Sequence, residues 1–352
     1  MTMIIDGMTQ STTVLPHFVN RPSWVDKLEY DVHVIGSIIE TIGVHMEFSY
    51  KNIGDNTNVL IDTINSCIQR MHEFRKSRSE PLPEVLYLQL DNVNHNKSKV
   101  LMTFLSLLVE KNIFKKVKVN YLLVGHTHEI IDQVFSRFSV LLRKTTCLTL
   151  QELMTAAKSS YTPAPTVSHV SSVTDWGEWF TRSNSLHTAT EALSFNHAFR
   201  IKRNINEDSR FHGQVTIHSK RLGWREPDQQ KEWRPRNGVL QLLRNPEGSP
   251  KQQLLKALDD KQMQQLNKIL IGFERNLGEA FTGDVKDYWV EALSMQENIA
   301  AGQTTTDGWE YLGPLDSSSE EGTLENSIWI DFSCLWCKKH SFQICIFQAG
   351  NL

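Results

Sequence analysis

Alternating and continuous apolar positions predict several strands in the first 145 residues. Residues 44–50 alternate strictly between apolar and polar side chains, which is typical of a strand with one buried face. Residues 30–39 are also strand-like, and the bend near Gly43 joins the two strands as a hairpin. Further apolar runs predict strands at 1–8, 85–91 and 116–125, the last two buried on both faces.

Apolar residues at helical spacing predict helices between and after the later strands. Residues 55–76 carry apolar side chains at helical spacing, and two more amphipathic helices begin near Val100 and Ile131. The order is three strands, helix, strand, helix, strand, helix. It predicts an α/β domain at 1–145 with a mixed five-stranded sheet, in which three antiparallel strands are followed by two joined through helical crossovers. The order resembles the ribonuclease-H-like fold of integrases and DDE transposases.

The remaining residues have a looser pattern. Residues 146–196 read as a helix followed by a Ser-, Thr- and Pro-rich linker. Residues 197–283 read as a basic, less regular accessory region with an amphipathic helix within 251–281. Residues 284–352 are acidic and are expected to form a disordered tail.

Composition limits the class of protein. Lys and Arg (37) nearly balance Asp and Glu (40), so overall charge points to neither nucleic acid nor membrane. Five unevenly spaced cysteines suit a reducing compartment better than a disulfide framework. No apolar run reaches membrane-spanning length, and we see no signal peptide. We expect a soluble intracellular protein with no membrane partner, the nucleus being one location for a chain that acts on DNA.

Four acidic residues are the candidate site. Asp6 ends the first strand, Asp91 ends the 85–91 strand, and Glu129 and Asp132 lie on the polar side of the last helix near its start. The alternative for that polar side is ordinary solvation. Carboxylates that converge repel one another unless cations lie between them, and Mg²⁺ or Mn²⁺ accepts such oxygen ligands. His126 and His128 are then expected to orient the turn that carries Glu129.

Zinc is not expected. Cys334, Cys337, His340 and Cys345 follow the order of a zinc knuckle, but the middle gap is two residues too short. The Gly-His-x-His at residues 125–128 is one motif of the four that define calcineurin-like metallophosphoesterases, which have a four-layer sandwich. That enzyme class is the less favoured alternative.

Two motifs support a family resemblance. "LQLDN", ending at Asn92, and "VGHTHEIIDQ", ending at Gln133, resemble the central motifs of a eukaryotic family of mobile-element origin, domain of unknown function 7869. That family is itself similar to DDE transposases. The resemblance is strongest over 82–143 and weak beyond residue 160.

The resemblance implies a function and a site. The function is a metal-dependent polynucleotidyl transferase or nuclease acting on DNA. The acidic triad would be Asp6, Asp91 and either Glu129 or Asp132, with Asp6, Asp91 and Glu129 as metal ligands and Asn92 beside the second acid.

This chain also departs from the family pattern. Ile130 replaces an acid of the family motif, the residues after Asn92 differ, and Asp6 lies close to the first residue. These departures indicate a truncated or decayed copy. A catalytically inactive descendant that binds nucleic acid or another partner is therefore the second hypothesis.

A basic segment at 200–236 is the candidate DNA contact. Basic side chains outnumber acidic ones there and alternate with aromatic ones, a combination that suits phosphates and exposed bases. The alternative is an ordinary solvated β-rich surface. The candidate residues are Arg200, Lys202, Arg203, Lys220, Arg221 and Arg225.

Overall fold

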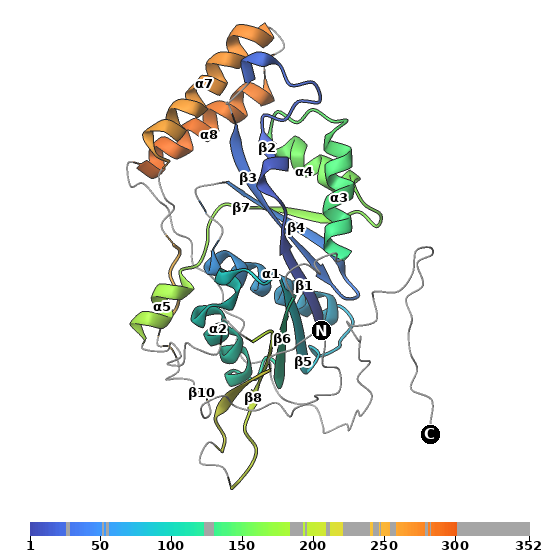
Figure 1. Cartoon of the computed structure of the whole chain (residues 1–352), viewed down its shortest axis with the longest axis vertical. Coiled ribbons are helices and arrows are strands. Elements are labelled where there is room, and N and C mark those ends of the chain that lie inside the picture. Colours follow the sequence, from blue (N-terminus) through green and yellow to red (C-terminus); the bar gives the residue numbers. More distant parts are fainter. Residues whose placement is uncertain are drawn as a thin grey trace. The chain divides into compact units, whose positions relative to one another are not determined.

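The structure is a computed structural model of the 352-residue chain (Figure 1). It describes residues 1–25, 29–50, 53, 56–122, 130–183, 193, 196–208, 212–220, 240–241, 246, 248–253, 258–278, 281 and 283–300. Contacts divide the chain into two units, 1–314 and 315–352, and the second unit lies outside the described residues.

Three antiparallel strands begin the fold. They are β1 (Thr2–Gly7), β3 (Tyr30–Ile39) and β4 (Gly43–Tyr50), with β1 paired to β3 and β3 to β4. The short strand β2 (Val14–Leu15) pairs with the start of β3, and single 3₁₀ turns lie at Gln10–Thr12 (η1) and Ser23–Val25 (η2). Alternation in β3 and β4 sends successive side chains to opposite faces, so both faces acquire an apolar layer.

Helical crossovers bring in the next two strands. The chain continues through α1 (Thr57–Lys76), β5 (Val85–Leu90), η3 (Asn94–Lys97), α2 (Lys99–Glu110), β6 (Lys116–Tyr121) and α3 (Ile130–Leu142). The Asn56 side chain caps α1, and Ser98 caps α2 by accepting a hydrogen bond from the Leu101 amide. Strand β5 is parallel to both β1 and β6. The predicted mixed sheet, with its first three strands antiparallel, is confirmed.

The sheet is wider than predicted. Its described strands follow the order β10-β9-β8-β6-β5-β1-β3-β4-β7, with β2 beside this path. The additional strands are β7 (Thr166–Val170), β8 (Ala198–Arg203), β9 (Val215–Lys220) and β10 (Leu240–Gln241). The described strands therefore form one mixed sheet, and the four-layer sandwich of a metallophosphoesterase is not found among them.

The segments after residue 145 contain more regular secondary structure than their composition indicated. The helix expected within 146–196 is α4 (Leu150–Ser159), and the linker expected after it contains strand β7 and α5 (Trp176–Arg182). The 197–283 region contributes β8 and β9 to the main sheet instead of standing apart, before α7 (Asp260–Leu277). The expected disordered tail begins with an ordered helix, α8 (Asp284–Ala300). Apolar side chains at β-strand or helical spacing, such as Val167 and Trp289, pack into the core and outweigh the polar composition.

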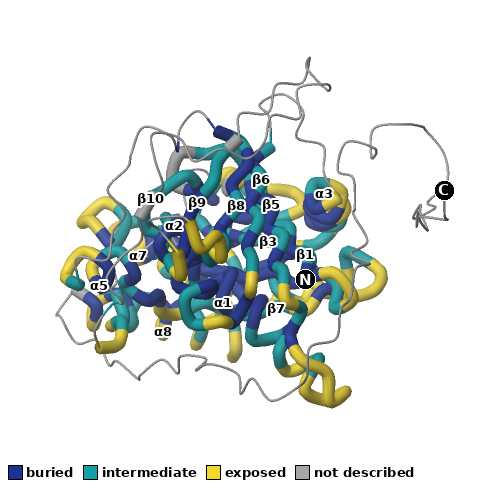
Figure 2. Tube along the Cα trace, turned by 90° about the horizontal axis from the view of Figure 1, so that it is seen from below, coloured by how far each residue is buried: buried dark blue, intermediate teal, exposed yellow. Residues whose placement is uncertain are grey.

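Two apolar cores lie on opposite faces of the sheet. One joins α1, α2 and α5 to β1, β5, β6, β8 and β9. The other joins α3, α4, α7 and α8 to β3 and β4. Figure 2 shows the buried segments running through the strands and along the helices that face them. None of the described helices is long and apolar enough to cross a membrane.

Candidate acidic site

Strand register places the first two acids side by side. Parallel pairing of β1 with β5 puts Ile5 opposite Leu90, so that Asp6 and Asp91 occupy the next position along each strand. Both follow buried residues, and their own side chains are half-buried. Because paired residues of adjacent strands point to the same face, the two carboxyl groups lie on one face of the sheet at one end of its central strands.

A glycine brings the third acid close. Gly36 pairs with Asp6 across β1 and β3, on the face that α3 covers. A Cβ atom at Gly36 would lie 2.7 Å from the Phe135 ring and 2.8 Å from Cδ1 of Ile131. The absent side chain therefore lets the first turns of α3 rest directly against β3. Asp132, in the first turn of α3, is carried toward Asp6 by this close contact.

The pKa of Asp6 reflects its burial and, to a smaller extent, the charges of its acidic neighbours. The pKa of Asp6 is raised from 3.8 to about 7. Burial is the largest cause, the negative charges of Asp91 and Asp132 add to it, and a hydrogen bond from the Gly7 amide opposes it. The Gly7 nitrogen lies 2.8 Å from Oδ1 of Asp6. The proton and a metal cation compete for the same charge, so a raised carboxyl pKa is what a cation-binding site without its cation should have.

The turn that follows Asp91 is held in place by two further residues. The side-chain amide of Asn96 donates to the Asp91 carbonyl oxygen at 3.1 Å. The Tyr121 hydroxyl in turn donates to the Asn96 carbonyl oxygen at 2.6 Å. The backbone amide of Asn92 donates to Oδ1 of Asp91. Tyr121 ends β6, so these contacts tie the position of Asp91 to the neighbouring strand.

Several predicted site residues lie outside the described residues. They are Glu129, His126 and His128, together with Cys334, Cys337, His340 and Cys345 of the considered zinc site. Of the two candidates for the third acid, the structure therefore places Asp132 alone. Among the described residues, no three His, Cys, Asp or Glu side chains are close enough to form a complete metal-binding set.

The donor chemistry nevertheless fits a hard divalent cation. Mg²⁺ is commonly held by one or two carboxylates, with water and substrate phosphates completing its coordination. Asp6 and Asp91 supply two carboxylates at neighbouring positions, and Asp132 adds negative charge. A complete protein cage is not required for that mode of binding, so the absence of a three-ligand set among the described residues is compatible with it.

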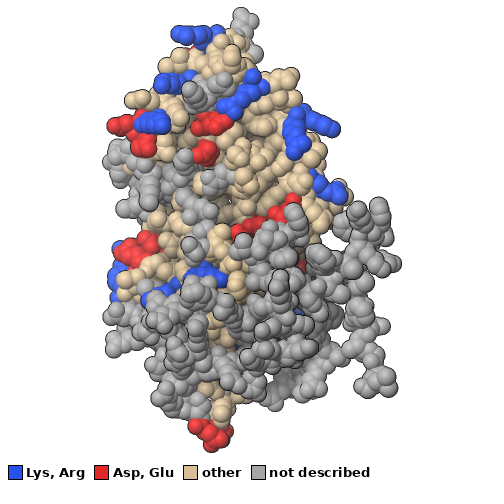
Figure 3. All heavy atoms as spheres, viewed as in Figure 1, with Lys and Arg blue, Asp and Glu red and all other residues tan. Residues whose placement is uncertain are grey.

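The candidate DNA contacts are only partly on one surface. Arg200 and Lys202 lie on β8 and point to the same face as the acids, whereas Arg203 forms an ion pair with Glu110 at 3.1 Å and donates to the Gly213 carbonyl oxygen at 2.6 Å. Arg203 therefore joins β8 to α2 and to the β8–β9 turn. Lys220 ends β9, and Arg221 and Arg225 lie outside the described residues. In the view of Figure 3, charges of both signs are scattered among neutral residues.

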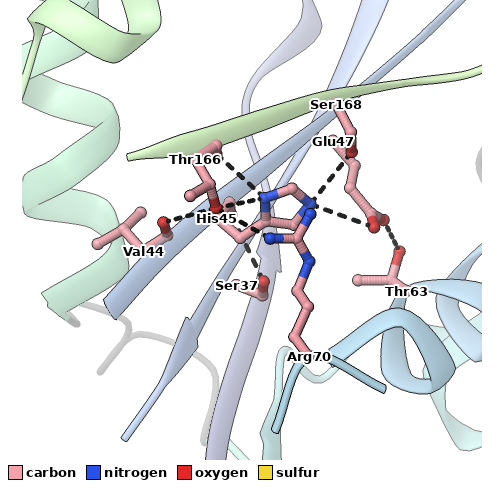
Figure 4. A network of polar contacts seen from close by, with 8 residues as sticks. All are labelled: Ser37, Val44, His45, Glu47, Thr63, Arg70, Thr166 and Ser168. Carbon is pink, nitrogen blue, oxygen red and sulfur yellow. Dashed lines mark hydrogen bonds and ion pairs between the residues drawn. The ribbon is translucent and has the colours of Figure 1, made fainter. Parts of the chain in front are cut away.

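A second polar cluster lies at the other side of the sheet (Figure 4). His45 and Glu47 on β4 are buried, with side chains 2% and 7% exposed. Nδ1 of His45 lies 2.8 Å from the Thr166 hydroxyl, and Nε2 lies 3.1 Å from the Ser168 hydroxyl and 3.5 Å from Glu47 Oε1. Serine and acid meet the same ring nitrogen, so the cluster is not a Ser-His-acid triad, in which they meet opposite nitrogens. Its contacts hold β7 against β4.

Sequence reasoning missed Gly36, Asn96 and Tyr121 as supporting residues. Gly36 sits inside a strand pattern, and an isolated strand glycine does signal a close backbone approach. Asn96 and Tyr121 carry no signal in the sequence, because their roles depend on how η3 folds back on β6.

Comparison with known proteins identifies the family. The model of Domain of unknown function (DUF7869) matches residues 25–219, which extends well past residue 160 but begins after Asp6. No curated protein and no solved structure matches the chain. Because the matched segment covers more than half of the 352 residues, the chain belongs to the DUF7869 family.

Proposed function

We propose that this chain is a transposase-derived, metal-dependent polynucleotidyl transferase or nuclease that acts on DNA and has a ribonuclease-H-like fold. The observation that carries the proposal is the placement of Asp6 and Asp91 at neighbouring positions of two paired strands. Asp132 lies near enough for its charge to contribute to the raised pKa of Asp6. The strand arrangement supports it, since three antiparallel strands are followed by two parallel ones reached through helices. The resemblance to DDE transposases points to Asp6 and Asp91 as well, with either Glu129 or Asp132 as the third acid.

Asp6 and Asp91 are the residues that would hold Mg²⁺ or Mn²⁺, with Asp132 or Glu129 as the third acid. Such ions, when bound, would supply the charge that activates the attacking oxygen and stabilises the leaving oxygen of an in-line phosphoryl displacement. The chain's own contribution is orientation. The amides of Gly7 and Asn92 each donate to one carboxylate oxygen, which fixes the rotation of Asp6 and Asp91. Gly36 and the turn held by Asn96 set the distances among the acids.

The test is a DNA-cleavage assay on supercoiled plasmid with Mg²⁺ or Mn²⁺. We expect nicking or linearisation by the wild type, and none by Asp91→Asn, because an amide cannot supply the charge that retains the cations. The exposed Asp208→Asn is a matched control that should cleave normally. Cleavage that survives Asp91→Asn would contradict the proposed site.

The second candidate is a catalytically inactive descendant that binds nucleic acid. One observation favours it: Ile130, which stands where the family motif has an acid, is 38% exposed at the first residue of α3. Replacement of the acid by this exposed isoleucine removes a negative charge beside the acidic site and adds no packing to the core. The same assay separates the hypotheses, since an inactive descendant would bind DNA and leave it intact with either metal.

A further inference from the structure

The face that carries the acids is not packed by helices along its whole width. Residues of α3, α4, α7 and α8 cover β3 and β4, and Ile4 of β1 packs against that core. No described residue of β5, β6, β8 or β9 belongs to this core. On the opposite face, by contrast, the same strands pack against α1, α2 and α5. One half of the acid-bearing face therefore lacks an apolar cover among the described residues.

Register gathers basic side chains on this half. Lys116 of β6 pairs with Lys202 of β8, and Lys118 pairs with Arg200. Paired residues point to the same face, so the four basic side chains form a two-by-two group, here called the basic strip. On the other side of β6, Lys118 pairs with Tyr87, and its ammonium lies 5.0 Å from the centre of the Tyr87 ring.

Like charges at these positions repel one another. Burial, together with the charges of Lys116 and Arg200, lowers the pKa of Lys118 to about 8. Burial together with the charges of Arg200 and Lys116 also lowers the pKa of Lys202. Like charges directly opposite on adjacent strands are destabilising. An anionic ligand would offset this repulsion, which explains why four half-buried cations lie together on the sheet.

The basic strip and the acids are parts of one surface. Tyr87 and Asp91 are four residues apart on the chain of β5 and point to the same face. At about 3.3 Å per residue, Tyr87 lies roughly 13 Å from Asp91, and Lys118 of the basic strip is the partner of Tyr87 on the next strand. Successive phosphates of one strand in a duplex advance about 3.4 Å along the helix axis, so this span corresponds to about four phosphates. A polyanionic strand lying on the strip would reach the acids without crossing a helix of the described fold.

We propose that Lys116, Lys118, Arg200 and Lys202 bind the phosphate backbone of a nucleic-acid strand and lead it to Asp6 and Asp91. The inference deepens the proposed function, on which it rests for the role of the acids. Charge complementarity identifies the ligand. A nucleic-acid backbone is a regular polyanion, and it matches a group of cations that lies beside a carboxylate site suited to divalent metal. Tyr87 adds an aromatic face on which a base can stack.

The experiment measures binding of the full-length chain to a fluorescent oligodeoxynucleotide by anisotropy, in EDTA so that chemistry cannot contribute. The variants are Lys116→Gln/Lys202→Gln and Lys118→Gln/Arg200→Gln. The control is Lys261→Gln/Lys268→Gln on exposed positions of α7, which removes the same charge. Each strip variant should weaken binding and reduce the slope of log affinity against log salt by about 2, roughly one per lost phosphate contact.

In the binding experiment, the proposal is overturned by a wild type that does not bind at low salt, or by strip variants that bind as the α7 control does. Failure of the proposed function is a separate result. If the chain binds DNA through the basic strip but never cleaves it with Mg²⁺ or Mn²⁺, the binding surface is supported and the proposed catalytic function is contradicted. If the strip variants cleave DNA as well as the wild type does, the catalytic function is supported and the proposed binding surface is contradicted. Thermal unfolding of each variant checks that it folds.

Discussion

Asp6 combines burial with like charge from two neighbours. Its pKa of about 7 means that the folded state holds, between pH 3.8 and 7, a proton that the unfolded chain has lost. The free energy of unfolding contributed by this group is therefore highest below pH 3.8 and falls as pH rises through 7. A divalent cation that replaces the proton should remove this penalty.

This linkage gives a pH prediction. In EDTA, Asp6→Asn should be more stable than the wild type at pH 7 and about equally stable at pH 4, because the amide carries no charge to bury. Thermal unfolding at intervals between pH 4 and pH 8 measures the difference in melting temperature. A difference that stays constant over this range would show that Asp6 does not titrate as described.

The sequence indicates the individual acidic residues better than the residues that hold polar side chains in place. Asp6 and Asp91 stand out because each ends an apolar strand, and parallel pairing then makes them neighbours. The buried pair His45 and Glu47 gave no such signal. Alternation assigned them to the polar side of a strand, but α1 covers that face and β7 pairs with β4 beside it, and Thr63 of α1 and Thr166 of β7 provide hydrogen bonds. Alternation cannot distinguish a solvated polar face from a buried hydrogen-bonded one.

At the scale of elements, helix α3 is the part that the sequence predicted well. The side chains of its apolar stripe, Ile131, Val134, Phe135, Phe138 and Leu142, are all buried. Its distance from the sheet depends on Gly36, because Phe135 and Ile131 occupy the space that a side chain there would need. The helix and the glycine together determine where Asp132 lies.

Gly36→Ala should therefore disturb both packing and the site. Overpacking of this kind typically costs about 1–3 kcal/mol of unfolding free energy. Moving α3 outward should also lower the pKa of Asp6, since the Asp132 charge recedes. Chemical denaturation measures the first effect, and the pH series described for Asp6 measures the second.

Gly177→Ala is the matched control for this substitution. A Cβ atom at Gly177 would meet its nearest neighbours at 3.8 Å, an ordinary contact, and alanine is the better helix former. We expect that variant to be as stable as the wild type or slightly more so. If Gly36→Ala were equally harmless, α3 would not be held against β3 as described.

At the scale of the whole molecule, the sequence predicted the central five strands and missed the breadth of the sheet. Strands β7, β8 and β9 join its two sides from positions far along the chain, and their segments are rich in polar or basic residues. Composition alone favoured a linker and a separate accessory region. Pairing with an existing strand satisfies backbone hydrogen bonds whatever the composition, which is why these additions could not be foreseen.

The breadth of the sheet matters for function. Without β8, Lys116 and Lys118 would be two basic residues on an edge strand, and pairing with Lys202 and Arg200 makes them part of a surface continuous with Asp91. The same strand thus completes a fold and positions charge. The family match ends at residue 219, within β9, so these strands belong to the shared domain.

The most direct measurement is isothermal titration of Mn²⁺ into the metal-free chain at pH 6.5, with Asp6→Asn, Asp91→Asn and the exposed Asp208→Asn alongside. We predict that the wild type and Asp208→Asn bind Mn²⁺ and release protons, detected as a heat that depends on the buffer, because Asp6 with its pKa of about 7 must deprotonate to bind a cation. Asp6→Asn and Asp91→Asn should lose the binding. A wild type that binds no Mn²⁺, or an Asp91→Asn variant that binds it with unchanged affinity and proton release, would contradict the central claim that these acids form a metal site.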